Sequence, residues 1–222
     1  MAHLVDFEII ILIIISTDYK SNTMISIDIG CSIHKLPGYI GVDLDPLPSV
    51  DVVANMESLP FSDSTIDLIH TRHTFEHVKD PHKCLTELYR VSKSTGNITI
   101  IVPHYSNHTY WADMTHIRPF SYRSFEYFDL EYAKLAGFPI YLPKVNIKTL
   151  SAKLVYWPER IYNSKSFVKR NILKIFDRII SGIANKSPFI CERIWCYWVG
   201  GFYEVKFDLQ PVKQNITKDL DK

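Results

Sequence analysis

The segment ISIDIGC, from Ile25 to Cys31, constrains the fold of this chain more than any other part of its sequence. Its apolar run contains one acid, Asp28, and is interrupted at Gly30. A second apolar run, Tyr39–Val42, leads to another acid, Asp43, thirteen residues beyond Gly30. A strand, a tight glycine turn and a second strand that ends in a carboxylate are typical of a parallel α/β sheet that holds the adenosine part of a cofactor.

The size and composition of the chain fit a single globular domain. Its 222 residues are enough for one well-buried α/β core with an appendage, and a charged content of 22% is ordinary for a soluble protein. The net charge of +1 is too small to attract the whole protein to nucleic acid or to an anionic membrane. The four cysteines form no C-x-x-C pair, so a zinc ribbon is not indicated and a reducing, cytoplasmic compartment is expected.

The N-terminal segment, residues 1–23, contains the apolar run Ile9–Ile15. The run is about half as long as a bilayer-spanning helix requires, and acids rather than basic residues flank it, unlike a secretory signal. We expect an extra edge strand or a poorly ordered leader here. A membrane or export role, and a true start at Met24, are the alternatives.

Apolar periodicity predicts five strands, at about 25–29, 40–43, 51–54, 66–70 and 97–102. Asp80 is expected to cap a helix that starts at Pro81 and ends before Gly96. Strands that alternate with helices indicate a parallel, doubly wound α/β sheet. The first two connections, of about ten and seven residues, are too short for a crossover helix, so one face should be thinly covered there.

The C-terminal half is expected to hold a helix over 121–136, a strand over 139–149 and a last strand over 202–212. Between them, residues 151–200 form an aromatic, basic and helical insert. An apolar stripe runs along it: Val168, Ile172, Ile175, Phe176, Ile179 and Ile183. The expected organisation is therefore a core over 24–150, the insert over 151–200, and a last strand with a tail over 201–222.

The order of the predicted strands and helices resembles that of the class I S-adenosylmethionine-dependent methyltransferases. The matching segments are IDIGC, GVDLDP, ANMESLPFSDSTIDLIHTRHTFEHV and LYRVSKSTGNITIIVP. The LPF and EHV elements look like the small-molecule branch often called type 11, and DMTHIRPFSYRSFEYF resembles a subgroup found among cell-surface polysaccharide genes. The resemblance covers about 25–145 and the final strand. It implies an enzyme with a Rossmann-like, mostly parallel seven-stranded sheet and S-adenosylmethionine as cofactor.

The resemblance also implies a set of cofactor-binding residues. Gly30 would let the backbone approach the cofactor, Asp28 could attract its ammonium, and Asp43 would accept hydrogen bonds from the ribose hydroxyls. The full expected set is Asp28, Gly30, Cys31, Asp43, Asn55, Met56, Leu59 and His73. Two positions depart from the family pattern, because Ser32 replaces a second glycine and Asn55 replaces an acid. Asp28 and Asp43 could instead be turn and loop acids, and Asp45 could be the ribose partner.

Candidate catalytic residues come from a cluster of histidines, since seven of the nine lie between His70 and His116. Methyl transfer is an in-line displacement that needs alignment and sometimes a base. His104 follows the fifth strand, and Asp113 precedes His116 by three residues, where a carboxylate could raise the basicity of the imidazole. We therefore expect His104, His116 and Asp113 to act in catalysis. A structural role for His104, and an ion pair between Asp113 and Arg118, are the alternatives.

The sequence indicates neither a metal site nor a nucleic-acid partner. His73 and His77 are four residues apart, but His77 belongs to an EHV element that this branch carries without metal, so no metal is expected. The N/D-P-P-Y/F/W element of nucleic-acid methyltransferases is absent after the fourth strand, so no nucleic acid is expected. The acceptor is expected to be a small molecule or a saccharide. A non-catalytic protein that binds through its insert is the alternative function.

The insert itself has three interpretations. It could be a lid over the carboxyl edge of the sheet, a homodimer surface, or a peripheral contact with anionic lipid. From Lys153 to Arg193 it has nine lysines or arginines against three acids, which leaves all three interpretations open.

Overall fold

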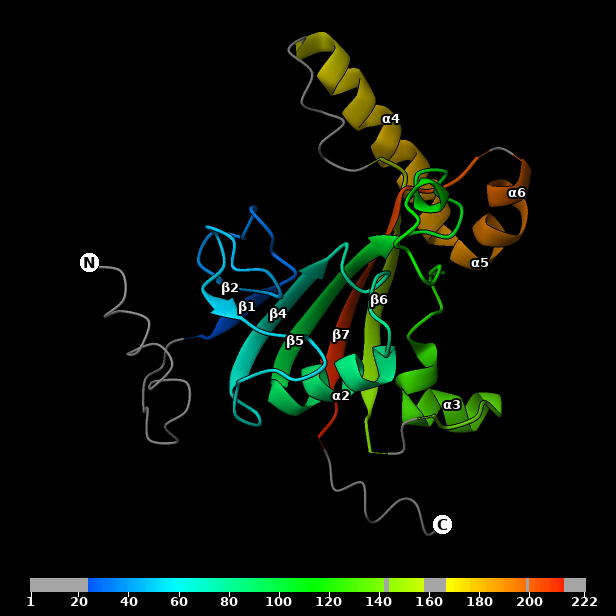
Figure 1. Cartoon of the computed structure of the whole chain (residues 1–222). Coiled ribbons are helices and arrows are strands. Elements are labelled where there is room, and N and C mark those ends of the chain that lie inside the picture. The colour runs from blue at the N-terminus through cyan, green and yellow to red at the C-terminus, as the bar shows by residue number, and fades with distance from the viewer. Residues whose placement is uncertain (1–23, 142–143, 158–166, 199, 214–222) are drawn as a thin grey trace.

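The computed structural model describes residues 24–141, 144–157, 167–198 and 200–213 (Figure 1). Its centre is a seven-stranded sheet in the order β3-β2-β1-β4-β5-β7-β6. Strand β7 is antiparallel to β5 and to β6, and the pairings among β1 to β5 are parallel. The strands are β1 (Ser26–Ile29), β2 (Ile40–Asp43), β3 (Val52–Val53), β4 (Ile66–Arg72), β5 (Ser92–Pro103), β6 (Ile147–Val155) and β7 (Glu204–Pro211).

The first five strands and the last one lie where the sequence predicts them. In the described chain, no helix lies in the connections β1–β2 and β2–β3, in agreement with their length. Helix α2 (Pro81–Val91) begins after Asp80, whose side chain accepts hydrogen bonds from the amides of His82 and Lys83. Its buried residues are Cys84, Leu85, Leu88 and Val91.

Two predicted elements differ from the structure. The helix expected over 121–136 is reduced to η2 (Glu126–Phe128) and α3 (Leu130–Ala136). Its first residues form a turn instead, because the Ser124 hydroxyl accepts the Ser121 amide and the Ser121 hydroxyl accepts the Arg123 amide. The strand expected over 139–149 is displaced toward the C-terminus, since β6 takes its register from β7 and extends to Val155.

The two faces of the sheet have opposite character. Ile98, Ile100, Phe207 and Leu209 belong to the buried apolar cluster that also contains the buried side chains of α2. Side chains on the other face are polar: Asp208 accepts hydrogen bonds from Thr99 and from Ser151, and Asp28 pairs with His70. The apolar core and helix α2 therefore lie on one side of strands β5 and β7, and polar side chains lie on the other side.

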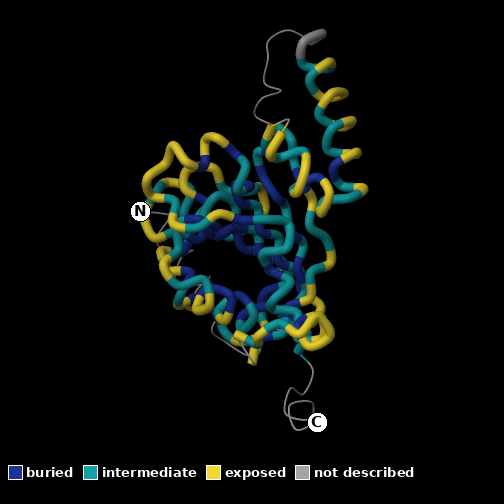
Figure 2. Tube along the Cα trace, turned by 90° about the vertical axis from the view of Figure 1, so that its right-hand side faces the viewer, coloured by how far each residue is buried: buried dark blue, intermediate teal, exposed yellow. Residues whose placement is uncertain are grey.

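The insert consists of α4 (Phe167–Lys186), α5 (Pro188–Ile190), the π-helix η4 (Cys191–Trp195) and α6 (Cys196–Trp198). Polar side chains of α4 face strand β6 and cap its backbone. Asn185 accepts the Leu154 amide at 2.8 Å and donates to the Leu154 carbonyl, and Ser181 accepts the Tyr156 amide. Figures 1 and 2 show α4 projecting beyond the sheet.

The apolar stripe of α4 points outward. Five of its side chains are between 45% and 60% exposed: Ile172, Ile175, Phe176, Ile179 and Ile183. Figure 2 shows exposed residues recurring along this helix. Within the described residues, no helix is both long enough and apolar enough to cross a membrane.

Candidate active site at the carboxyl edge of the sheet

The glycine turn after β1 lies beside the end of β2. The amide of Gly30 donates to the carbonyl of Val42 at 2.8 Å, and Gly30 has a φ of +70°. A Cβ at Gly30 would lie 2.0 Å from Oγ1 of Thr74, which follows β4. The glycine is therefore required for the turn itself and for close packing against the next strand.

Asp43 ends β2 and closes this turn. Its Oδ2 accepts the amide of Ser32 at 2.8 Å, and its Oδ1 accepts the amide of Asp45 at 3.3 Å. A carboxylate has about four acceptor positions, so each oxygen retains capacity for one further donor. Ser32, at the position of the missing glycine, has a φ of +48°. The turn and the carboxylate thus come together as the sequence predicts.

Asp28 has a different environment from the one expected. Its side chain is nearly buried, Oδ1 lies 2.7 Å from Nδ1 of His70, and Oδ2 accepts the amide of Leu36. Both oxygens therefore have protein partners, and the carboxylate orders the connection between β1 and β2. Cys31 is buried in the same turn, and burial together with the charges of Asp28 and Asp43 raises the pKa of its thiol to about 11.

The residues expected beside adenine divide into two groups. Asn55 is exposed after β3, and its side-chain oxygen accepts the amide of Glu57 in a local turn. Met56 and Leu59 are buried in the main core. These two side chains therefore pack against the core, and Asn55 alone of the three presents a polar group at the surface.

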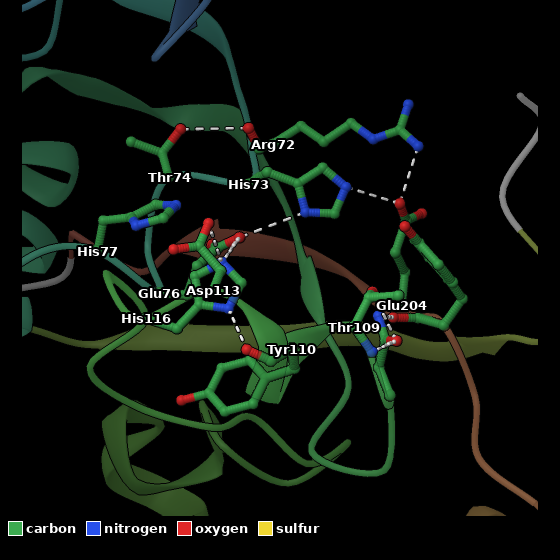
Figure 3. Close-up of polar contacts among 12 residues, drawn as sticks. Arg72, His73, Thr74, Glu76, His77, Thr109, Tyr110, Asp113, His116 and Glu204 are labelled. Carbon is green, nitrogen blue, oxygen red and sulfur yellow. Dashed lines mark hydrogen bonds and ion pairs between the residues drawn. The ribbon is translucent and has the colours of Figure 1, made fainter.

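A histidine in a strained conformation follows β4. His73 has a φ of +53°, which is uncommon for a residue with a Cβ. Its Nε2 lies 2.8 Å from Oε1 of Glu204, and its Nδ1 lies 3.3 Å from Oε1 of Glu76 (Figure 3). Arg72 also donates to Glu204, at 2.8 Å.

The ionisation of this cluster follows from its contacts. Burial alone would lower the pKa of His73, but its hydrogen bonds to Glu204 and Glu76 outweigh burial and raise that pKa. Burial would raise the pKa of Glu204, and the bonds from His73 and Arg72 outweigh it, so this pKa is lowered. The cluster thus favours a cationic His73 between two carboxylates.

His116 and Asp113 come together as predicted. Nδ1 of His116 lies 2.8 Å from the carbonyl of Tyr110, and its Nε2 lies 3.7 Å from Oδ2 of Asp113 and 4.0 Å from Oε1 of Glu76. Hydrogen bonds from Thr115 lower the pKa of Asp113. The Arg118 guanidinium instead donates to the carbonyls of Val78 and Lys79.

His104 does not join this group. Its side chain is 0% exposed, with Nδ1 2.6 Å from the Ser106 hydroxyl and Nε2 2.9 Å from Oε1 of Glu192. The same Glu192 oxygen accepts the amide of Tyr122. Because a fully buried ring with two engaged nitrogens cannot touch an acceptor, the catalytic prediction for His104 is corrected to a structural role. It fixes the insert to the loop after β5.

Three residues of the site were not predicted: Thr74, Glu76 and Glu204. Glu76 stands in the EHV element, where attention to the acid beside the histidine could have found it. Glu204 lies 131 residues from His73 in sequence, and no local pattern links the two.

The sheet order agrees with the fold that the sequence predicts. It is a Rossmann-like, mostly parallel seven-stranded sheet in which β7 is inserted antiparallel between β5 and β6. Residues 35–100 match the family model described as "Methyltransferase domain". The matched segment runs from the β1–β2 connection into β5 and makes up under a third of the chain.

Comparison with solved structures gives distant similarities. The YcgJ protein of Bacillus subtilis is 15% identical, with a TM-score of 0.49 over 96% of this chain and 100% of that one. An S-adenosylmethionine-dependent methyltransferase from Archaeoglobus fulgidus is 17% identical, with a TM-score of 0.49 over 92% and 94%. A possible histamine N-methyltransferase from Thermotoga maritima is 15% identical, with a TM-score of 0.48 over 87% and 84%. No curated protein matches the chain.

Proposed function

We propose that the chain is an S-adenosylmethionine-dependent methyltransferase that acts on a hydroxyl of a small-molecule or glycan-type acceptor at the carboxyl edge of the sheet. The observation that carries the proposal is the contact between Gly30 and Thr74, which joins two groups of residues. One group is the glycine turn with Asp43, and the other is the polar cluster after β4. Ligands of open α/β sheets bind at this edge.

The residues at the first of these groups fit the cofactor. Asp43 retains acceptor positions for the two ribose hydroxyls, next to backbone that bends at Gly30 and Ser32. Asn55 would accept from the adenine amino group. When bound, S-adenosylmethionine supplies an electrophilic methyl group. Asp28 contributes by holding the connection after β1 in place rather than by direct contact.

At the second group, His116 is the proposed proton acceptor. Its Nδ1–H donates to the Tyr110 carbonyl, which leaves the lone pair on Nε2 available. Asp113, 3.7 Å away, would stabilise the imidazolium that forms when the acceptor hydroxyl loses its proton. His73 is held by two carboxylates, so we assign it to positioning and electrostatics at the end of β4.

A thermal-shift titration tests the cofactor part of this proposal. S-adenosylmethionine and S-adenosylhomocysteine should each raise the melting temperature, and NAD should not. Incubation of small-molecule extracts with a methyl-labelled donor should then give a labelled product with the wild-type protein and none with His116→Ala. A shift with the donor but no labelled product from any extract would favour the non-catalytic binding protein.

A separate observation favours a contact with an anionic membrane surface. Polar side chains of α4 hydrogen-bond to the backbone of β6 and of the residue after it, and the apolar stripe of α4 is exposed. This arrangement is the reverse of that of a helix that packs its apolar face on a core. Among the residues of the insert whose burial the structure describes, the exposed basic ones are Lys174, Arg178, Lys186 and Arg193. The apolar surface continues into a cavity of about 270 Å³ lined by residues that include Ile183, Ile190 and Ile194. Apolar and basic residues together match a lipid interface rather than a second copy of the same basic helix.

Vesicle sedimentation tests this contact. The protein should bind vesicles that contain phosphatidylserine and not vesicles of phosphatidylcholine alone, and Ile175→Ser with Ile179→Ser should abolish binding. A dimer in light scattering that the same double variant makes monomeric would overturn the proposal in favour of a dimer surface. The reduced cysteines of the described chain suit a reducing compartment, and we propose that this surface faces the cytoplasm.

A further inference from the structure

A buried carboxylate at the candidate site has an unpartnered oxygen. The side chain of Glu76 is 0% exposed, and its Oε1 lies 3.3 Å from Nδ1 of His73. Its Oε2 has no hydrogen-bond partner among the described residues. A buried carboxylate oxygen without a partner is costly, so this atom indicates a missing cation or donor.

Two neighbouring histidines, His77 and His116, lie close to Glu76, and each is oriented through its Nδ1. Nδ1 of His116 lies 2.8 Å from the Tyr110 carbonyl. Nδ1 of His77 lies 3.3 Å from the Thr115 carbonyl and 3.0 Å from the Thr115 hydroxyl, which itself donates to Asp113. A ring that donates from Nδ1 carries its lone pair on Nε2, which is how histidine ligands of metals are held. The two ring centres are 4.7 Å apart.

The three residues offer one ligand atom each within a small volume. The ligand atoms of Glu76, His77 and His116 all lie within 4.8 Å of one another. Ligands at about 2.0–2.2 Å from one tetrahedral ion lie about 3.3–3.6 Å apart, so side-chain rotations that move the ligand atoms by about 1 Å would close the site. The amide of Ile117 donates to the Glu76 carbonyl at 2.8 Å, which ties the two ligand-bearing segments together.

We propose that Glu76, His77 and His116 bind a divalent transition-metal ion, with Asp113 as a fourth ligand from the solvent side. Oδ2 of Asp113 is 3.7 Å from Nε2 of His116, its other oxygen is engaged by Thr115, and its side chain is 48% exposed. Two imidazoles with carboxylates suit Zn²⁺, Co²⁺, Mn²⁺ or Fe²⁺ and disfavour Mg²⁺ and Ca²⁺. His73 would orient the Glu76 carboxylate through the contact between its Nδ1 and Oε1 of Glu76.

This site does not depend on methyl transfer, because metal binding is measured on the protein itself. The lone pair on Nε2 of His116 can serve only one of the two roles at a time: it is a ligand when an ion is bound, and it is the proton acceptor of the proposed reaction when the site holds no ion. A bound ion would then lower the pKa of an acceptor oxygen that completes its coordination. Loss of activity in His116→Ala cannot separate these two roles, so the test must measure the metal.

The experiment is a Co²⁺ titration of full-length, chelator-treated protein followed by absorption spectroscopy, with Zn²⁺ competition. The wild type should bind one Co²⁺ per chain with visible d–d bands that Zn²⁺ abolishes. Glu76→Gln, His77→Ala and His116→Ala should each weaken binding at least tenfold. His108→Ala is the matched control, because His108 is an exposed histidine of the same loop and should leave binding unchanged.

The outcomes are separable. No Co²⁺ bound by the wild type, or equal loss in His108→Ala, overturns the site. Circular dichroism checks that each variant folds. If a histidine variant unfolds, the nearly isosteric Glu76→Gln decides: wild-type stability with lost binding supports the site, and unchanged binding overturns it. S-adenosylhomocysteine binding by the same variants reports separately on the cofactor turn, so failure there leaves the metal result standing.

Discussion

Gly30 and Thr74 approach so closely that a Cβ on the glycine would lie 2.0 Å from the threonine Oγ1. That hydroxyl donates to the carbonyl of Arg72 at 3.2 Å. The end of β1 is therefore packed directly against the end of β4. The contact sets the position of the glycine turn at Gly30 relative to the polar cluster that starts at His73.

A comparison of two glycines tests the importance of this contact. Gly30 and Gly137 have nearly the same φ, +70° and +69°, but a Cβ at Gly137 would meet nothing within 4 Å. Gly137→Ala should lower the free energy of unfolding by about 1–2 kcal/mol, the conformational cost alone. Gly30→Ala adds a clash and should lower it further, as measured by urea denaturation. Equal decreases in the free energy of unfolding of the two variants would show that the Thr74 side chain can move away from the new Cβ without a measurable cost.

Asp43 and Asp45 provide a matched pair for the ribose interaction. Only Asp43 closes the turn by accepting the amide of Ser32. Charge-assisted hydrogen bonds are worth about 1.5–3 kcal/mol, so Asp43→Ala should weaken S-adenosylhomocysteine binding by roughly 10- to 150-fold in calorimetry. Asp45→Ala should change affinity less than threefold. The reverse ranking would make Asp45 the ribose partner.

Local features of the fold could be predicted from the sequence, and distant pairings could not. The strand ends at Ile29 and Asp43 and the N-cap at Asp80 depend on neighbouring residues, so periodicity and spacing were sufficient. The helix expected from Ser121 failed because two serine hydroxyls compete for the backbone amides of its first turn.

The candidate site shows the same division. His116 and Asp113 lie three residues apart, and their proximity was predictable. Glu204 reaches His73 only because β7 is inserted beside β5, a pairing that depends on the whole sheet. His104 occupies the expected loop, but the sequence could not show that Glu192 of the insert engages it.

Glu204 should make stability depend on pH below neutrality. Its pKa is lowered in the folded protein, so its contribution is present above the ordinary glutamate pKa of 4.5 and is lost as the pH falls through the folded value. Glu204→Gln should therefore destabilise the protein most at pH 6–7 and progressively less below about pH 4.5. Urea denaturation of both proteins across this range measures the difference. A difference that stays constant down to pH 3 would contradict the assignment.

The reversed amphipathicity of α4 predicts opposite effects for two positions on the same helix. Asn185 accepts from the amide of Leu154 and donates to its carbonyl, so Asn185→Ala should expose unpaired backbone groups of β6 and cost about 1–3 kcal/mol in urea denaturation. Ile179 is 54% exposed, and Ile179→Ser should leave stability within about 0.5 kcal/mol of the wild type. If Ile179→Ser were instead the more destabilising change, the apolar stripe would belong to the core, and a surface contact through α4 would have no basis.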